Sequence, residues 1–553
     1  MTFTPSLPTQ KFKKKPIIWT ISGADCSGGA GIAADIKTGH ALNVEVCHLI
    51  TANTVQNSVE LSAVNVIEVQ VLAQQAQALR FDKPPAVIKI GLMVNRAQIN
   101  WLVATLFMLK QQLPDLLVVY DPVGQASVGG RLSSLTANAL APLMPLIDVI
   151  TPNLIEAKQL SGLNPKNTHN AKLLALNILQ LGCKAVIIKG GHTDSENTNN
   201  AEKNNAAKTH CIDICLQSLN LSSRALISLQ SPKINTNYSH GGGCSFTSAL
   251  ASFLAHGYLL RDAFTLTKAF INQGLSLCAD IPSDNNKGEN PGEGESQNNL
   301  EVNNSSINNA NNENYYGAFQ QGLWPTKLRY FPNVISPLYQ QVKLSPTFPS
   351  LGLADSEKLG LYPVVDSLAW LECLLPLHLN IIQLRIKSEN TAELALLIEK
   401  AVTLASNYNC RLFINDHWQL AIKYGAYGVH IGQEDLNSAD LKAIAKSGLR
   451  LGISTHGCYE FLLAKQLQPS YLAIGAIFPT NTKDMTGQIQ GLTNLRQILA
   501  LADNIPIVAI GGINQQRLKQ VWCTGVSAVA VVTAITQAEQ PVVATQTMQA
   551  MLS

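Results

Sequence analysis

The 553-residue sequence has few charged residues, few aromatic residues and no C-x-x-C cysteine pair. Charged residues make up 14% of the chain and aromatic residues 6%, and the formal net charge at pH 7 is only +3. This small net charge provides no electrostatic argument for a nucleic-acid partner. The eleven cysteines are scattered and form no C-x-x-C pair, so neither a zinc ribbon nor a disulfide framework is indicated. A reducing cytoplasm is the expected compartment.

The sequence also lacks an apolar run long enough for a transmembrane helix. Its first fifteen residues carry four lysines with no apolar region after them. They therefore predict a solvated basic leader and neither a signal peptide nor a membrane anchor. We expect small-molecule substrates as partners, with no nucleic acid and no membrane; whether the chain forms a homo-oligomer stays open.

Hydrophobic residues make up 46% of the chain, which excludes global disorder and is enough for several domains. Residues 283–314, rich in Asn and Glu, almost lack large apolar side chains and are predicted to be a disordered linker, because they cannot bury enough surface to offset their ordering entropy. The predicted domains are residues 16–282 and 351–553, with a connecting segment at 315–350. A second Asn-rich patch, residues 194–207, is expected to be a surface loop.

Eight apolar, β-branched runs alternate with helix-like stretches in the C-terminal 200 residues. This pattern predicts a (β/α)₈ TIM barrel, whose strands are buried on both faces. The runs are residues 361–366, 381–386, 411–416, 428–433, 450–455, 471–478, 505–513 and 528–535.

Polar residues gather at the carboxyl ends of these runs, where the active sites of such barrels lie. Asp416 and Asp435 follow neighbouring strands, and two carboxylates suit a hard cation such as Mg²⁺. The basic and hydroxyl side chains around them suit a pyrophosphate bound to that ion, and the turn at Gly511 and Gly512 suits a second phosphate. The residues alone thus predict a Mg²⁺-dependent enzyme that joins or cleaves phosphorylated compounds. Taken singly, an Asp or Asn at a strand end is as readily a helix cap.

The motifs QLRIK, LFIND, GVHIGQEDL, LGIST, FPTNTK and VAIGGI closely resemble thiamine phosphate synthase across residues 360–540. The resemblance implies coupling of hydroxymethylpyrimidine diphosphate to thiazole phosphate. The diphosphate would leave first, forming a pyrimidinylmethyl cation that the thiazole nitrogen captures. It also implies Mg²⁺ on Asp416 and Asp435, and catalytic charge stabilisation by Lys387 and Lys483.

By the same resemblance, the pyrimidine-diphosphate site would comprise Gln383, Arg385, Lys387, Asn415, Ser454 and Lys483. The thiazole-phosphate site would comprise Thr480, Thr482, Gly511, Gly512, Val532 and Thr533. An alternative with the same fold is a thiazole tautomerase, which could dispense with a diphosphate site; the aspartate pair and the two lysines argue against it.

The N-terminal part also alternates strands and helices, without eightfold regularity, and predicts an open, doubly wound, mostly parallel sheet. Glycine-rich turns at residues 22–31 and 240–244 each precede a helix. Such turns let the backbone close on an anion at the positive end of the helix dipole. The same position predicts a lowered pKa for the Cys244 thiol, unless this cysteine is simply a small buried residue.

Two further positions stand at strand ends in this part. Asn153 and Glu156 could place Mg²⁺ and phosphate, or could form a helix cap with a first-turn acid. Lys189 ends an apolar strand, where a phosphate contact is expected.

The segments SGADCSGGAGIAADIKT, IKIGLM, DPV, ITPNLIEA, IIKGGH and HGGGC resemble the hydroxymethylpyrimidine and phosphomethylpyrimidine kinases of the ribokinase-like superfamily. The resemblance implies an α/β/α sandwich that uses ATP as phosphoryl donor together with Mg²⁺. The pyrimidine site would comprise Gly23, Asp35, Gln56 and Val123. The ATP and Mg²⁺ site with its anion hole would comprise Asn153, Glu156, Gly241 and Gly243. The catalytic residues would be Cys244, nearest the substrate hydroxyl, and Lys189, on phosphate.

The sequence departs from this kinase pattern at several positions. Cys26 replaces a proline, Ala33 replaces a glutamine, and Tyr238 and Ser239 replace an Asn-Thr pair. Gly242 replaces the threonine of HGTGC, and this replacement removes a hydroxyl from the anion loop. The two parts together predict a bifunctional thiamine-biosynthesis enzyme, because the product of the kinase is a substrate of the barrel. One alternative keeps the synthase but makes the kinase-like domain a degenerate ligand-binding or regulatory module. Another gives the kinase pyridoxal or a similar alcohol as its substrate.

Overall fold

The computed structural model describes thirteen stretches of the chain, which are residues 14–57, 60–124, 130, 132–133, 135–163, 170–191, 209–220, 223–279, 317–336, 347–354, 357–387, 391–480 and 489–552. The predicted linker 283–314 and the predicted loop 194–207 lie outside the described residues, as does nearly all of the basic leader. The chain divides into two compact units. One comprises Met1–Leu226, Ser231–Gly257 and Leu266–Pro325, and the other comprises Ile227–Gln230, Tyr258–Thr265 and Thr326–Ser553. The predicted domain boundaries stay predictions.

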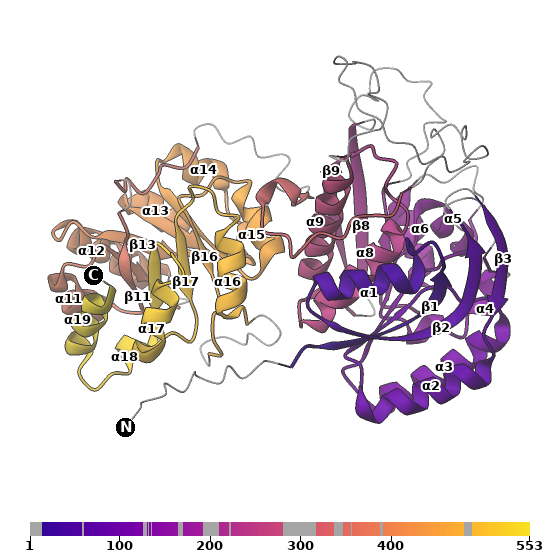
Figure 1. The fold of residues 1–553 in the computed structure, drawn as a ribbon. Helices are drawn as coiled ribbons and strands as arrows, with labels where there is room; N and C mark the ends of the chain where they lie inside the picture. Colours follow the sequence, from indigo (N-terminus) through magenta and orange to yellow (C-terminus); the bar gives the residue numbers. More distant parts are fainter. Residues whose placement is uncertain are drawn as a thin grey trace, which may run out of the picture. The chain divides into compact units, whose positions relative to one another are not determined.

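The N-terminal sheet has the order β10-β9-β8-β7-β6-β5-β4-β1-β2-β3 among the described residues (Figure 1). Its strands are β1 (Ile17–Asp25), β2 (Glu45–Gln56), β3 (Leu61–Val66), β4 (Val87–Ile90), β5 (Leu117–Tyr120), β6 (Val149–Ile150), β7 (Ala185–Ile188), β8 (His210–Ser218), β9 (Arg224–Pro232) and β10 (Asn333–Ile335). From β2 through β1 and β4 to β7 neighbouring strands are parallel, and β3 and β8 run antiparallel to their partners. The winding reverses between β1 and β4, which is where ligands bind in such sheets.

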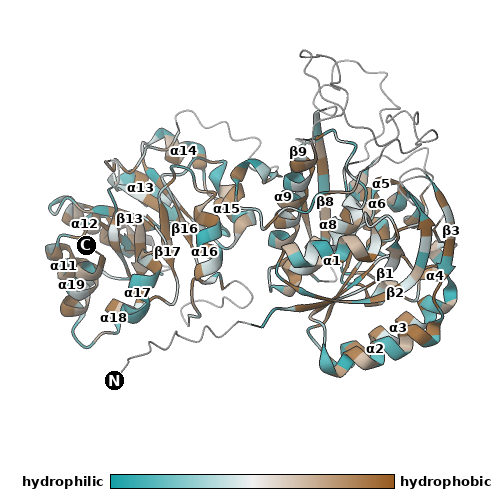
Figure 2. Ribbon diagram, in the orientation of Figure 1, coloured by the Kyte–Doolittle hydropathy of each residue, from teal (hydrophilic) through white to brown (hydrophobic). Residues whose placement is uncertain are grey.

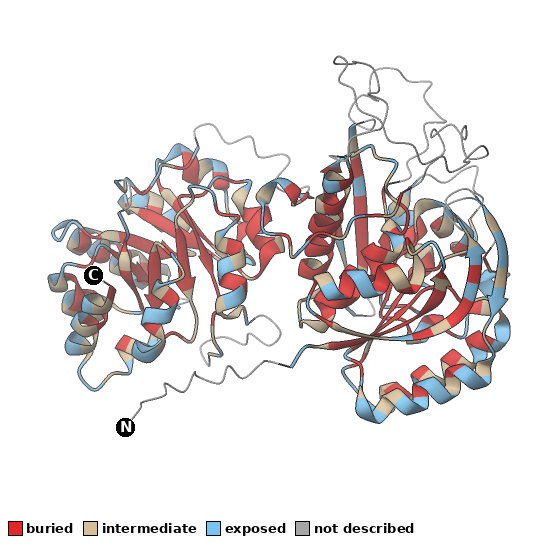
Figure 3. Ribbon diagram, viewed as in Figure 1, coloured by how far each residue is buried: buried red, intermediate tan, exposed pale blue. Residues whose placement is uncertain are grey.

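Helices cover both faces of this sheet. On one face α1 (Gly31–Ala41) and α8 (Gly242–Ala255) pack on each other and on the central strands, and α9 (Leu260–Ala279) follows α8 in the chain. The other face holds α2 (Val69–Asp82), α3 (Arg96–Gln112), α4 (Ala137–Leu140), η1 (Met144–Leu146), α5 (Leu154–Leu160) and α6 (Ala171–Leu179), which share one apolar core with the strands. The predicted doubly wound α/β/α fold is confirmed. Strands β4, β5 and β7 are almost wholly buried and rich in β-branched residues, as parallel strands covered on both faces must be. The central strand β1 is likewise buried along nearly its whole length (Figure 3).

The C-terminal part is a closed barrel of eight parallel strands in chain order, which confirms the predicted TIM barrel. The strands are β11 (Gly360–Val365), β12 (Ile381–Leu384), β13 (Arg411–Asn415), β14 (Gly428–Ile431), β15 (Arg450–Thr455), β16 (Tyr471–Ile474), β17 (Ile507–Ile510) and β18 (Ala528–Val531). The helical segments from η3 onward are η3 (Leu328–Tyr330), α11 (Leu368–Leu374), η4 (Leu375–Leu377), α12 (Thr391–Ser406), α13 (Trp418–Tyr424), η5 (Asp435–Asn437), α14 (Leu441–Lys446), α15 (Cys458–Lys465), α16 (Gly491–Leu499), α17 (Gln515–Trp522), α18 (Thr533–Thr536) and α19 (Pro541–Leu552).

Two apolar layers hold the barrel together, and hydrophobic residues accordingly concentrate on its strands (Figure 2). The outer layer lies between the strands and the helices. The inner layer fills the barrel and is built around three aromatic rings, those of Tyr362, Phe413 and Tyr471, with the last two centroids 5.1 Å apart. The barrel is therefore a packed core, and substrates must bind at one of its ends. Among the described residues, no helix combines the length and apolar character needed to span a bilayer.

Candidate active sites

In the N-terminal fold, two glycine-rich loops meet at the carboxyl ends of the strands. One follows β1 and the other precedes α8. Gly241, the residue before α8, has a φ of 79°, and a Cβ there would lie 1.9 Å from the carbonyl oxygen of Gly29. Position 241 therefore requires glycine. At Gly242, by contrast, no described atom lies within 4 Å of an ideal Cβ, so a larger side chain has room.

A buried contact between a carboxylate and a histidine joins these two loops. Asp25 Oδ2 lies 2.7 Å from His240 Nε2, and the Asp25 carboxylate also accepts hydrogen bonds from the backbone N–H groups of Ser27 and Ala30, each at 2.9 Å. Burial alone would raise the pKa of Asp25, but the hydrogen bonds from His240 and Ser27 hold it well below its usual range. Asp25 is not among the residues predicted from the sequence, although an acidic residue directly at a strand end could have indicated it.

A second buried pair lies beneath the loops. Lys89, in the middle of β4, places Nζ 2.9 Å from both carboxylate oxygens of Asp35, and both side chains are fully buried. Asp35 also accepts from the hydroxyls of Thr20 and Ser248. The predicted pyrimidine-binding residue Asp35 thus points at Lys89. Lys89 was not predicted from the sequence, although a cation inside the apolar strand VIKI could have indicated it.

Asn153 and Glu156, two of the predicted ATP and Mg²⁺ residues, follow β6, and the predicted catalytic Lys189 follows β7. Asn153 Oδ1 accepts from the N–H of Glu156 at 2.9 Å, and Glu156 Oε2 accepts from the N–H of Asn153 at 2.8 Å, so the two form the capping box of α5. Lys189 Nζ lies 2.9 Å from Asp121 Oδ1. Burial and the nearby Asp121 raise the pKa of Glu156 to about 7, although Lys189 opposes them. Asn153 and Glu156 therefore form the helix cap that the sequence allowed, and the pKa of the Glu156 carboxyl lies near neutral pH.

Cys244, the third residue of α8, is half-buried beside these charges. Burial raises the pKa of its thiol to about 11, which Lys89 only partly offsets, while Asp121 and Asp35 raise it further. The expected lowering of this pKa is therefore wrong, because burial and two nearby carboxylates outweigh the helix terminus and the lysine. An ideal Cβ on Gly243 lies 3.6 Å from Lys189 Nζ, which places this lysine at the start of the same helix.

The other predicted pyrimidine residues are Val123, Gly23 and Gln56. Val123 packs on the cluster of Ala52, Leu92 and Leu132. A Cβ on Gly23 would lie 2.8 Å from Leu92 Cδ2, so glycine permits the close approach of these segments. Gln56 ends β2, and its carbonyl oxygen accepts from the thiol of Cys26 at 3.1 Å.

In the barrel, the predicted metal ligands Asp416 and Asp435 are near neighbours at the carboxyl ends of β13 and β14. Burial and the charge of Asp435 raise the pKa of Asp416, which the N–H of Gly432 and the charge of Arg385 partly oppose. The Asn415 amide donates to Asp416 Oδ2, and the Asp416 N–H donates to the His430 carbonyl at 2.9 Å. Among the described residues no cluster of three or more His, Cys, Asp or Glu side chains could hold a metal. Two repelling carboxylates fit Mg²⁺, which completes its coordination with water and phosphate oxygens.

The remaining predicted synthase residues fall at the same end of other strands. Gln383 lies at the end of β12 with its side chain buried, Arg385 follows it with its N–H on Val365 O at 2.7 Å, and Lys387 is exposed. Ser454 lies in β15, where its hydroxyl is 2.8 Å from His430 Nε2. Burial lowers the pKa of His430 to about 3, so the imidazole is neutral at pH 7. His430 is not among the residues predicted from the sequence, although a histidine inside the apolar strand GVHI could have indicated it.

The predicted phosphate turn after β17 has a backbone conformation that favours glycine. Gly511 and Gly512 both have positive φ, and a Cβ on Gly512 would lie 2.4 Å from the carbonyl oxygen of Pro479. Val532 directly precedes α18, which begins at Thr533. Thr480 lies in the segment after β16, whereas the predicted Thr482 and Lys483 lie outside the described residues.

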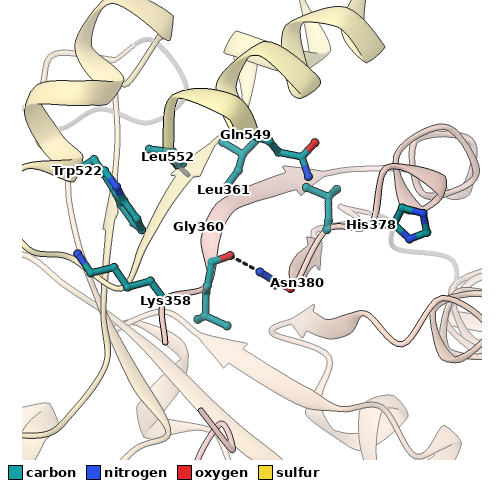
Figure 4. A pocket seen from close by; sticks show the side chains of 10 residues that line it. Lys358, Gly360, Leu361, His378, Asn380, Trp522, Gln549 and Leu552 are labelled. Carbon is teal, nitrogen blue, oxygen red and sulfur yellow. Dashed lines mark hydrogen bonds between the residues drawn. The ribbon is translucent and has the colours of Figure 1, made fainter. Parts of the chain in front are cut away.

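A cavity of about 250 Å³ opens at the opposite, amino-terminal end of the barrel strands (Figure 4). Lys358, His378 and Asn380 line it together with Trp522, and the Asn380 amide donates to the Leu359 carbonyl oxygen at 3.2 Å. None of the predicted site residues lines this cavity. The candidate site of the barrel is therefore the set of predicted residues at the carboxyl ends of its strands, at the other end from this cavity.

The chain matches two family models, one for each fold. Residues 25–290 match phosphomethylpyrimidine kinase, and residues 361–535 match thiamine monophosphate synthase. The thiamine-phosphate synthase of Yersinia pestis is 54% identical over 194 residues, which are 35% of this chain and 88% of that protein. The thiamine-phosphate synthase of Proteus mirabilis is 55% identical over 182 residues, which are 33% of this chain and 85% of that protein.

Solved kinases resemble the N-terminal part. A phosphomethylpyrimidine kinase from Clostridium difficile is 31% identical, with 47% of this chain and 99% of that chain covered and a TM-score of 0.37. A pyridoxal kinase from Staphylococcus aureus in complex with ADP is 27% identical, with 48% and 89% covered and a TM-score of 0.40. The chain belongs to the thiamine-phosphate synthase family through its barrel and carries a phosphomethylpyrimidine kinase domain before it, which makes it a bifunctional enzyme of thiamine biosynthesis.

Proposed function

We propose that the N-terminal domain phosphorylates hydroxymethylpyrimidine and then its monophosphate with ATP, and that the barrel couples the resulting diphosphate to thiazole phosphate. ATP use follows from the kinase family. The observation that carries the proposal is that, in each fold, predicted site residues from separate strands converge at the carboxyl end of the sheet. Chance would scatter such residues over both ends.

In the kinase, the N–H groups of Gly241 and Gly243 at the start of α8 would bind the transferred phosphoryl group, and Lys189 would stabilise its charge. Cys244 would lie next to the substrate hydroxyl. Its thiol keeps its proton at neutral pH, which is compatible with phosphoryl transfer because this reaction depends on positioning and charge stabilisation more than on a strong base.

The pyrimidine ring would lie against Gly23, Gln56 and Val123. We propose that Asp35 contributes to this site through Lys89, because its carboxylate is fully buried against that ammonium. Asn153 and Glu156 would help to hold Mg²⁺. The capping box uses Oε2 of Glu156 and leaves Oε1 for this role.

In the synthase, Asp416 and Asp435 would hold Mg²⁺, which when bound neutralises charge on the departing diphosphate. Arg385, Lys387 and Lys483 would bind the diphosphate and stabilise it as it leaves. The pyrimidine would contact Gln383, Asn415 and Ser454. The site for thiazole phosphate would be formed by Thr480, Thr482, Gly511, Gly512, Val532 and Thr533. The thiazole nitrogen would then capture the pyrimidinylmethyl cation.

The chemistry of both sites calls only for small-molecule substrates, and we propose that the enzyme works in the cytoplasm, where reduced thiols such as Cys244 persist. The competing proposal is a degenerate kinase domain, and the observation in its favour is the hydroxyl missing at Gly242.

Two parallel reactions of the purified chain separate the proposals. The first contains hydroxymethylpyrimidine, ATP, Mg²⁺ and thiazole phosphate, and the second replaces the first two with ready-made pyrimidine diphosphate. Thiamine phosphate in both reactions would support both activities in their order. Product only in the second would leave an active synthase with a binding or regulatory kinase-like domain, and product in neither would overturn the proposal. Side-by-side turnover of pyridoxal tests the other kinase substrate.

A further inference from the structure

Five polar side chains form one continuous hydrogen-bonded chain through the interior of the barrel. The chain begins at Ser454, whose hydroxyl lies 2.8 Å from His430 Nε2. His430 Nδ1 lies 2.7 Å from the Tyr471 hydroxyl, which lies 2.9 Å from the Tyr362 hydroxyl. Finally, Gln383 Nε2 donates to the Tyr362 hydroxyl at 3.2 Å. The chain thus connects β15, β14, β16, β11 and β12.

The middle of this chain is sealed inside the barrel. Tyr362 and Tyr471 are 1% and 0% exposed, and His430 and Gln383 are also buried. A buried hydroxyl without an acceptor costs free energy, so each proton in the chain must find a partner. The two ends differ from the middle, because Gln383 and Ser454 are both proposed to contact the pyrimidine.

The donation from the Gln383 amide to the Tyr362 hydroxyl sets the direction of the chain, because every hydroxyl beyond it must then pass its own proton onward. Tyr362 accepts from Gln383, and among the described contacts its own proton has Tyr471 as its acceptor. The Tyr471 hydroxyl must then donate to His430 Nδ1. This leaves the imidazole proton on Nε2, where it donates to the Ser454 oxygen.

The direction of the chain determines what each end offers a ligand. Since Gln383 uses its amide N–H group inside the barrel, its carbonyl oxygen is presented as an acceptor. Since Ser454 accepts from His430, its own proton is available for donation. An aminopyrimidine carries the complement, namely amino N–H donors and ring-nitrogen acceptors.

We propose that Tyr362, Tyr471 and His430 are positioning residues that fix Gln383 as an acceptor and Ser454 as a donor, and thereby select an aminopyrimidine over rings without the amino group. The proposal rests on the proposed pyrimidine site and deepens it. A site built to bond a substrate N–H discriminates against an analogue lacking that group, because its own polar atom is left unpaired.

Tyr471→Phe tests the proposal, because it removes the central hydroxyl and keeps the ring that packs on Phe413. The full-length variant is assayed for coupling with pyrimidine diphosphate and with its analogue lacking the amino group. We expect KM for pyrimidine diphosphate to rise about tenfold and the preference over the analogue to fall by a similar factor, as for a lost buried hydrogen bond. KM for thiazole phosphate should not change.

Tyr427→Phe is the matched control. Its ring also packs on Phe413, with centroids 5.7 Å apart, but its hydroxyl donates to the Leu351 carbonyl and lies outside the chain. Equal analogue preference in Tyr471→Phe and Tyr427→Phe would overturn the proposal. If Tyr471→Phe does not fold, Tyr362→Phe breaks the same chain and carries the same expectation.

Gln383→Ala and Ser454→Ala distinguish a failure of the proposed site from a failure of the chain. If both variants raise KM for pyrimidine diphosphate while Tyr471→Phe and Tyr362→Phe behave like the control, the site stands and the positioning chain is wrong. If neither variant changes this KM, the proposed pyrimidine site is wrong, and the positioning chain is overturned with it.

Discussion

Replacing Gly242 with threonine should increase the kinase activity of the N-terminal domain. Gly242 is the first residue of α8, directly after the left-handed Gly241, and no described atom lies within 4 Å of an ideal Cβ there. A threonine side chain therefore fits without displacing a neighbour. It would restore the hydroxyl that the kinase pattern carries beside the proposed phosphoryl site.

The expected gain follows from one added hydrogen bond to a charged group, which contributes about 1.5–3 kcal/mol. At about 1.4 kcal/mol per factor of ten, kcat/KM for ATP should rise roughly 10- to 100-fold if the bond forms in the transition state. The assay is ADP release by the full-length chain with hydroxymethylpyrimidine as acceptor. Coupling of ready-made pyrimidine diphosphate by the barrel should be unchanged.

Two controls separate the hydroxyl from the loss of glycine flexibility. Gly242→Val has the shape of threonine without the hydroxyl, so its kinase activity should stay near the wild-type level. Gly241→Ala should abolish kinase activity, because a Cβ at that position would lie 1.9 Å from the Gly29 carbonyl oxygen. Equal kinase activity in Gly242→Thr and Gly242→Val would refute a role for the hydroxyl, because the two side chains have the same shape and only threonine carries that group.

Four other substitutions test the sites separately. Asp25→Asn should destabilise the kinase domain by about 1–3 kcal/mol at neutral pH, because it weakens the buried pair with His240. The pKa of Asp25 in the folded protein lies below its ordinary value of 3.8, so the ionised carboxylate stabilises the fold above pH 3.8. This stabilisation is lost as the pH falls through the folded pKa. The difference in melting temperature between the wild type and Asp25→Asn should therefore shrink in acid. Asp435→Ala and Lys483→Ala should each reduce coupling at least 100-fold, on the order of the loss of a charge-stabilising group, and leave ATP consumption intact; loss of both activities would point to misfolding. Cys244→Ala should abolish phosphorylation and preserve coupling of supplied pyrimidine diphosphate, and unchanged kinase turnover would exclude a catalytic role for this thiol.

Both folds could be predicted from the sequence because their signals are local. A parallel strand covered on both faces must be apolar along its length, so eight such runs separated by helical stretches predict a closed barrel. The polar residues that end those runs, such as Gln383, Asn415 and Asp416, could be selected for the same reason, since strand ends of a barrel share one face. The glycine turns were equally visible, because a backbone that closes on an anion or on another loop needs glycine at particular positions.

The hydrogen-bond and ion-pair partners of these residues could not be predicted, because they depend on which distant segments of the chain meet in the fold. Asp25 and His240 are 215 positions apart, and only the packing of the two glycine loops brings them within 2.7 Å. Asp35 and Lys89 pair across a helix and a strand, and only this packing shows that the predicted pyrimidine-binding Asp35 is held in a buried ion pair. The pKa of Cys244 was predicted in the wrong direction because the helix terminus is a local feature, whereas burial and the nearby carboxylates are not.

The hydrogen-bonded chain in the barrel likewise depends on contacts between residues that are distant in the sequence. Each of Tyr362, His430 and Tyr471 lies on its own strand and reads in the sequence as one polar group in an apolar run. Closure of the barrel points all three into one core, where each hydroxyl and ring nitrogen must be satisfied by another strand. The sequence by itself determined the folds, the strand ends and the chemistry available there, whereas the tertiary structure alone decided which charges and protons face each other.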